Sequence, residues 1–134
     1  MKSMSSIVDI DTNKQPEIRV LPMPSDTNAT GDIFGGWLMS QVDIAGSIAA
    51  YRCVGNRVVT VAVNEFLFIK PLFVGDLVSI YAEIEHIGTT SIRVALSVFA
   101  ERGQGNEKPL KVAQAVLTYV SIDDNKKPKT IKNV

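Results

Sequence analysis

The sequence predicts an α+β fold, in which a single long helix packs against an antiparallel sheet. Only residues 36–53 have the length and the proline-free, Ala-, Leu-, Met- and Ile-rich composition of a helix. After residue 57, apolar and polar residues alternate in several segments, as they do in strands. The size also fits one globular domain, since the 134 residues are 46% hydrophobic and 21% charged. One helix with a run of strands is an α+β arrangement.

The predicted elements follow the order β-α-β-β-β-β. Residues 17–24 form a short extended segment, which its two prolines restrict to a sheet edge or a bend. The helix at residues 36–53 is followed by Gly55 and Asn56, which favour helix termination. Because this helix is apolar nearly all round, we expect it to be largely buried. Four strands are then predicted, at residues 57–70, 76–86, 91–101 and 110–122.

These elements define a single domain at residues 17–122. We expect residues 1–16 to form a flexible N-terminal extension. We expect residues 123–134, which hold four lysines, to form a basic C-terminal tail. No segment has the apolar stretch of a secretory signal or a membrane helix. We therefore expect a cytoplasmic protein with no membrane partner.

Charge and composition exclude several classes of function. The 14 Lys and Arg residues balance 14 Asp and Glu residues, which argues against a nucleic-acid partner. The single cysteine, Cys53, and the single histidine, His86, exclude an internal disulfide and a metal site built on several such ligands. We expect no metal and no cofactor. The chemistry should rest on carboxylates, amides, hydroxyls and backbone groups.

One face of the predicted helix carries a candidate site. Gly36, Ser40, Asp43 and Ser47 lie at spacings of four, three and four residues, so they share one stripe. An unpaired carboxylate is costly to bury, and small residues suit a face that a ligand approaches closely. The alternative is that this stripe is the solvent-exposed face and that Asp43 is a surface residue.

The approach to the helix gives a second signal. Gly35 and Gly36 stand where the free backbone N–H groups of the helix begin. Such a terminus binds anions, and it can also stabilise the charge that develops on a carbonyl oxygen. The alternative is a packing contact where the helix meets the sheet.

The same region resembles a known family signature. Residues 28–46 read Asn-Ala-Thr-Gly-Asp-Ile-Phe-Gly-Gly-Trp-Leu-Met-Ser-Gln-Val-Asp-Ile-Ala-Gly. This segment resembles the signature of hotdog-fold acyl-CoA thioesterases, in particular the YciA-type bacterial acyl-CoA hydrolases, which are related to animal cytosolic acyl-CoA hydrolases. Further similarities lie at residues 58–63, 69–71 and 74–76. The resemblance implies a hotdog fold, a long helix wrapped by an antiparallel sheet, and hydrolysis of acyl-coenzyme A.

The resemblance also implies roles for individual residues. Asp43 matches the family's catalytic aspartate, which acts as a general base or as a nucleophile. Asn28 matches its catalytic asparagine, which orients the water or the carbonyl, and Gly35 matches the glycine whose amide polarises the thioester carbonyl. In this family the asparagine and the aspartate of one site come from neighbouring protomers. We therefore expect a homodimer at minimum, assembled further as a trimer of dimers.

Coenzyme A needs further contacts along its length. For the substrate and its pantetheine arm, the candidates are Gly36, Thr60 and the turn of Gly88, Thr89, Thr90 and Ser91. For the phosphates, the candidates are Arg57, Arg93 and the lysines of the C-terminal tail. Ordinary turn chemistry and surface charge account equally well for these residues.

Two other functions are compatible with parts of the pattern. A non-catalytic acyl-CoA-binding protein would bind the thioester without releasing thiol. A hotdog dehydratase or hydratase would pair a histidine with an acid, but His86 lies at a strand end outside the helix motif. Cys53 lacks a suitable histidine, so a buried structural thiol is the better interpretation than a nucleophile.

Overall fold

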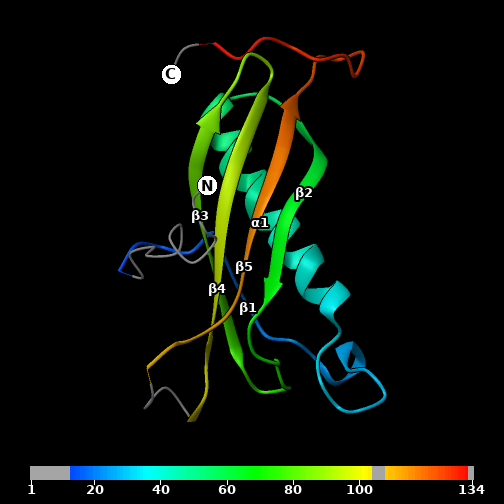
Figure 1. The fold of residues 1–134 in the computed structure, drawn as a ribbon, viewed down its shortest axis with the longest axis vertical. Coiled ribbons are helices and arrows are strands. Elements are labelled where there is room, and N and C mark those ends of the chain that lie inside the picture. Colours follow the sequence, from blue (N-terminus) through cyan, green and yellow to red (C-terminus); the bar gives the residue numbers. More distant parts are fainter. Residues whose placement is uncertain (1–12, 104–107, 133–134) are drawn as a thin grey trace.

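The computed structural model describes residues 13–103 and 108–132 of the chain. One long helix lies against one face of a five-stranded antiparallel sheet, as Figure 1 shows. The predicted α+β class and the predicted order of elements are both confirmed. Residues 1–12 of the predicted N-terminal extension lie outside the described residues.

The sheet has the strand order β1-β3-β4-β5-β2, and every neighbouring pair is antiparallel. Its short strand β1 and its long strand β2 are the two edges, so the extended segment before the helix does lie at an edge, as its prolines predict. Strands β3, β4 and β5 are the interior strands. The bounds are β1 Ile18–Val20, β2 Val58–Phe68, β3 Leu77–Ile87, β4 Ser91–Glu101 and β5 Leu110–Ser121.

The helix α1 spans Gly35–Val54, one residue longer at each end than predicted. It ends at Gly55, whose φ of 69° lies in the left-handed region that glycine adopts without strain. A 3-10 turn, η2 (Pro24–Asp26), replaces the last part of the predicted extended segment. Loop residues 27–34 then connect this turn to the helix.

The core lies between α1 and the face of the sheet that it covers. Alternate residues of β3 and β4 point into this core, as their period of two predicts. The helix contributes its buried residues Leu38, Val42, Ala45 and Ala50. The fully buried strand residues include Val78, Ile80, Ile92, Val94, Leu96 and Val98.

The expectation that the helix is largely buried is wrong for the single chain. Five of its twenty residues are buried, whereas Met39, Ile44 and Tyr51 are 38%, 47% and 54% exposed. The reason is geometric, because the sheet contacts one side of the helix and no described segment covers the other. The apolar composition therefore reflects a second apolar face that remains open.

The C-terminal segment folds back on one end of the sheet, at the top of Figure 1. The backbone N–H of Lys129 donates to the carbonyl of Ser121 at 2.8 Å, and that of Ile131 donates to Thr89 at 2.8 Å. The Asp123 carboxylate accepts two further backbone N–H groups of the same turn. Most of the predicted basic tail is therefore fixed against the sheet.

Candidate active site

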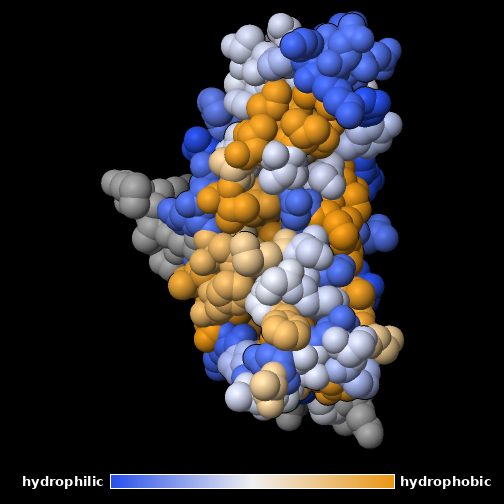
Figure 2. All heavy atoms as spheres, turned by 90° about the vertical axis from the view of Figure 1, so that its right-hand side faces the viewer, coloured by the Kyte–Doolittle hydropathy of each residue, from blue (hydrophilic) through white to orange (hydrophobic). Residues whose placement is uncertain are grey.

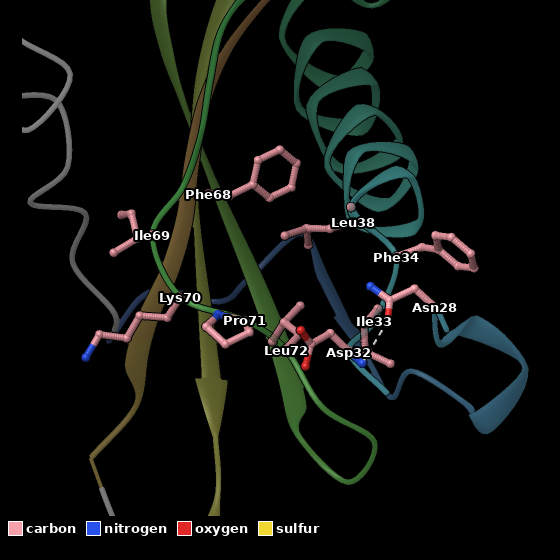
Figure 3. Close-up of a pocket in the computed structure, with 11 residues that line it drawn as sticks. Asn28, Asp32, Ile33, Phe34, Leu38, Phe68, Ile69, Lys70, Pro71 and Leu72 are labelled. Atoms are coloured by element: carbon pink, nitrogen blue, oxygen red, sulfur yellow. Dashed lines mark hydrogen bonds between the residues drawn. The ribbon is translucent and has the colours of Figure 1, made fainter. Parts of the chain in front are cut away.

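A cavity of about 320 Å³ opens beside the N-terminus of α1 (Figure 3). The loop before the helix forms one wall, and the chain between β2 and β3 forms the opposite wall. Backbone bonding joins the two walls, since the Ile33 N–H donates to the Leu72 carbonyl at 2.9 Å. The lining residues are Asn28, Asp32, Ile33, Phe34, Gly35, Leu38, Phe68, Ile69, Lys70, Pro71 and Leu72.

Asn28 presents a hydrogen-bond donor to this cavity. Its Oδ1 accepts the backbone N–H of Thr30 at 2.9 Å, the Thr30 hydroxyl at 2.8 Å and the backbone N–H of Asp32 at 3.1 Å. Because backbone N–H groups can only donate, they fix which side of the amide is oxygen. The Nδ2 group then points into the cavity, as Figure 3 shows. The group that Asn28 offers to this cavity is therefore a donor.

Gly35 and Gly36 differ in why each position is a glycine. At Gly35 a Cβ would lie 3.3 Å from the Phe68 ring, so the close approach of this ring favours glycine. At Gly36 nothing lies within 4 Å of such an atom. Packing thus accounts for Gly35 but not for Gly36. Both residues belong to the first turn of α1, where backbone N–H groups have no intrahelical acceptor.

Asp43 is neither a freely solvated surface residue nor an unpaired buried one. The Thr60 hydroxyl donates to its Oδ1 at 2.6 Å. The Tyr119 hydroxyl lies 3.1 Å from the same oxygen and 2.9 Å from the Asp43 backbone carbonyl. No hydrogen bond to Oδ2 is found within residues 13–103 and 108–132. One carboxylate oxygen is therefore held, and the other is available.

Tyr119 and Gly46 belong to this cluster, and neither was predicted from the sequence. Tyr119 is fully buried. Burial, and then the nearby Asp43 carboxylate, raise the pKa of its hydroxyl above the usual range, so it stays protonated and acts as a donor. The one signal in the sequence was Gly46 itself, a glycine inside a helix, which can mark a close approach of another group.

A single chain does not bring the candidate catalytic groups together. Asn28 and Gly35 share the cavity, but Asp43 is not among its lining residues. Asp43 lies eight positions after Gly35 on the helix, which corresponds to about 12 Å along the axis. Asp43 and Thr60 instead lie where α1 meets the edge strand β2.

A second hollow, of about 570 Å³, lies along the C-terminal half of α1. Its apolar wall meets two cationic side chains, Arg57 and Lys126, at the end of the sheet. Neither side chain has an ion-pair partner among the residues that the structure describes. The hollow is lined by Ser47, Ile48, Tyr51, Arg57, Val58, Val59, Ile122 and Lys126.

The other candidates for substrate contacts lie elsewhere. Arg93 pairs with Glu85 at 3.7 Å on the sheet surface. The turn from Gly88 to Ser91 is closed by a 2.7 Å backbone bond, and its residues line neither of the two cavities. Thr60 contacts Asp43 directly, so its hydroxyl is already engaged.

His86 is exposed at the end of β3, and Cys53 packs partly buried against the core. Among the described residues, no three His, Cys, Asp or Glu side chains cluster as a metal site would require. Within the same residues, no helix has both the length and the apolar character needed to cross a membrane.

Known proteins resemble this chain over most of its length. The thioesterase superfamily matches residues 30–106. The acyl-CoA thioester hydrolase YciA of Salmonella typhimurium is 43% identical over 126 residues, covering 91% of this chain and 95% of that protein. A hexameric hotdog-fold thioesterase of Campylobacter jejuni is 40% identical with a TM-score of 0.85, covering 91% of this chain and 93% of that one.

A further solved structure is an acyl-CoA hydrolase of Staphylococcus aureus in complex with butyryl coenzyme A, coenzyme A and coenzyme A disulfide. It is 32% identical with a TM-score of 0.80, covering 87% of this chain and 71% of that one. The fold, the matched signature region and these identities agree with the resemblance seen in the sequence. The chain therefore belongs to the hotdog-fold thioesterase superfamily, and the YciA acyl-CoA thioester hydrolases are its relatives.

Proposed function

We propose that this protein hydrolyses acyl-coenzyme A to a free acid and coenzyme A, in a site that two protomers share. The observation that carries the proposal is a pair of complementary half-sites. One half is the Asp43 carboxylate, held through one oxygen. The other half is the cavity, into which Asn28 directs a donor beside the free amides of the helix N-terminus. The Salmonella relative, which is named an acyl-CoA thioester hydrolase, supports the same activity.

The proposed chemistry needs only these groups. Asp43 accepts a proton from water as the water oxygen attacks the thioester carbonyl. The Gly35 amide and Asn28 Nδ2 stabilise the oxyanion that forms. The C–S bond then breaks, and the departing sulfur takes the proton back from Asp43. In the alternative route, Asp43 Oδ2 attacks the carbonyl itself, the C–S bond breaks to release the coenzyme A thiolate, and water then hydrolyses the resulting anhydride. Both routes use the same available oxygen, and neither requires a cofactor.

The exposed face of α1 and β2 supports sharing between protomers. Strand β2 is a long edge strand whose Val59, Val61 and Val63 are exposed, and such an edge readily pairs with another chain. Figure 2 shows that apolar side chains cover much of this face. A two-fold partner placed here would bring its Asn28 and Gly35 toward Asp43. The Campylobacter relative is hexameric, which supports a trimer of dimers built on this pair.

The hollow with Arg57 and Lys126 is the proposed site for the phosphates of coenzyme A. Ser47 and Tyr51 continue the helix stripe from Asp43 at successive spacings of four residues, so they lead from the carboxylate to this hollow. Two cations at the end of an apolar track match an anionic nucleotide on a long pantetheine arm. Gly36 stays a candidate beside the thioester. Gly88, Thr89 and Ser91 also stay candidates for contacts with the substrate, although they line neither cavity.

The direct test is hydrolysis by the variants Asp43→Ala and Asn28→Ala. We expect Asn28→Ala to lower kcat by about 10²–10³, the effect of losing one oxyanion donor, and Asp43→Ala to lower it by about 10²–10⁴. Asp124→Ala, an exposed aspartate outside both half-sites, is the matched control. Free thiol release from acyl-CoA measures turnover, and circular dichroism checks folding.

Wild-type turnover in both folded variants would contradict the assignment. Tight binding of acyl-CoA without thiol release in the unmodified protein would instead favour the non-catalytic alternative. The exposed position of His86 gives no support to a dehydratase or hydratase. A cytoplasmic location and the absence of nucleic-acid and membrane partners stay predictions from the sequence.

A further inference from the structure

We propose that Tyr119 is a positioning residue, which holds the Asp43 carboxylate in the orientation that leaves Oδ2 free to react. The inference rests on the proposed thioesterase function and adds a residue from a distant strand to its machinery. Tyr119 does not touch the substrate in this proposal. It acts on the reaction only through Asp43.

The Tyr119 hydroxyl contacts two atoms of Asp43. It lies 2.9 Å from the Asp43 backbone carbonyl and 3.1 Å from Oδ1 of the same residue. The single proton of this hydroxyl is shared between the two acceptors, so the hydroxyl links the main chain and the side chain of Asp43. The Thr60 hydroxyl donates to Oδ1 as well, at 2.6 Å. Because both donors engage the same oxygen, the carboxylate cannot turn without losing them.

The position of Tyr119 makes this contact rigid. It stands opposite Thr60 on β2 and opposite Ile92 on β4, and it is 0% exposed. A buried hydroxyl requires a partner, and Asp43 supplies the recorded partners among the described residues. Both hydroxyls that hold the carboxylate therefore come from paired positions in the sheet, which is stiffer than a loop.

Gly46 gives an independent reason to connect Tyr119 with the helix. A Cβ at this position would lie 2.1 Å from the Tyr119 hydroxyl oxygen and 2.9 Å from the ring carbon that bears it. Glycine inside a helix is unfavourable relative to alanine. The passage of the tyrosine hydroxyl toward Asp43, one turn earlier on the helix, explains why the chain has glycine here.

The test is the variant Tyr119→Phe, which removes only the hydroxyl. We expect kcat to fall roughly ten- to a hundredfold, the effect of losing a hydrogen bond to a charged group. KM should stay within about twofold, since the hydroxyl does not bind the substrate. A fall in kcat at unchanged KM is the expected sign of an effect on the reacting carboxylate. A merely structural role would lower the folded fraction and leave kcat per folded enzyme unchanged.

Tyr81→Phe is the matched control, since Tyr81 is also buried in the sheet but lies on β3, away from Asp43. Its kinetics should match those of the unmodified protein. Gly46→Ala is the second variant, and it should reproduce the fall in kcat of Tyr119→Phe because the added methyl group displaces the hydroxyl. Both variants are compared with the unmodified protein after their folded state is checked.

Two outcomes overturn the proposal: a Tyr119→Phe kcat within about twofold of the unmodified value, or a rise in KM as large as the fall in kcat. Combining Tyr119→Phe with Asp43→Ala gives a further check. A residue that acts only through Asp43 should cause no additional loss in that background. Failure of the proposed function can be told apart from failure of the Tyr119 proposal. It would appear as unimpaired turnover in the single variant Asp43→Ala.

Discussion

At Asn28 the backbone decides what the side chain can do. Three donors of the surrounding loop occupy its Oδ1, so the group turned to the cavity is an N–H donor. An aspartate at this position could hold the loop in the same way but would turn an acceptor toward a developing oxyanion. An asparagine at this position thus meets two demands at once: the observed closure of the loop and the proposed donation to a ligand.

Arg57 is the residue on which we base a prediction for coenzyme A. Arg57→Ala should raise KM for acyl-CoA about tenfold, because a charge-assisted bond to a phosphate is lost. It should leave KM for the matching acyl-pantetheine unchanged, since that substrate has no nucleotide. Arg93→Ala is the control, because Arg93 pairs with Glu85 on the sheet surface. An equal rise in KM for both substrates would contradict a phosphate role for Arg57.

The sequence alone predicts the residues that stand in one continuous motif. Asn28, Gly35 and Asp43 are recognisable because their types and spacing lie within one short segment. Tyr119 is 76 residues from Asp43 in the sequence, and alternation marks it only as a strand residue. Thr60 was predicted as a substrate contact, yet its hydroxyl donates to Asp43. Such roles depend on strand pairing, which composition and period do not determine.

At the scale of elements, the connection between β2 and β3 is held by a partly buried ion pair. Arg102 Nε and Nη2 lie 2.8 Å and 3.0 Å from the two carboxylate oxygens of Asp76, which is 3% exposed. The same guanidinium donates to the Pro71 carbonyl at 2.7 Å and lies 5.0 Å from the centre of the Phe73 ring. Since Pro71 and Leu72 line the cavity, this pair shapes one of its walls.

Arg102→Ala should therefore lower the free energy of unfolding by about 2–3 kcal/mol. The loss leaves the buried Asp76 carboxylate without its main partner, which costs more than losing an exposed pair. Arg93→Ala is the matched control and should cost less than about 1 kcal/mol, because its pair with Glu85 is exposed. Urea unfolding at a fixed protein concentration measures both. An equal loss of unfolding free energy in the two variants would show that the Asp76–Arg102 pair stabilises the protein no more than the exposed pair does.

The strands could be predicted closely from their period, and the helix from its composition. Strand β4 has the predicted bounds, and α1 differs by one residue at each end. Burial of α1 could not be predicted in the same way. An apolar helix surface looks the same in a sequence whether the same chain or a second chain covers it. Ile44 and Tyr51 belong to the helix that was expected to be largely buried, and they instead lie on the open face.

At the scale of the whole molecule, three features converge on one face. The edge of β2 is unpaired within the described sheet, the outer side of α1 is apolar, and Asp43 lies between them. Asn28 and the cavity lie near the end of the same helix. A chain with this arrangement holds both kinds of proposed catalytic group but does not place them together. The separation of Asp43 from Asn28 therefore predicts a site that two protomers share, and the family resemblance predicts the same.

Mixing two inactive variants tests whether the site is shared. In a dimer of Asp43→Ala with Asn28→Ala, one shared site loses both groups and the other keeps both. Random assembly of equal amounts makes about half of the dimers mixed, so about a quarter of the unmodified activity should return. If each chain carried its own complete site, every site would lack one group and no activity would return. Thiol release after joint refolding measures the recovery, and each variant refolded alone is the control.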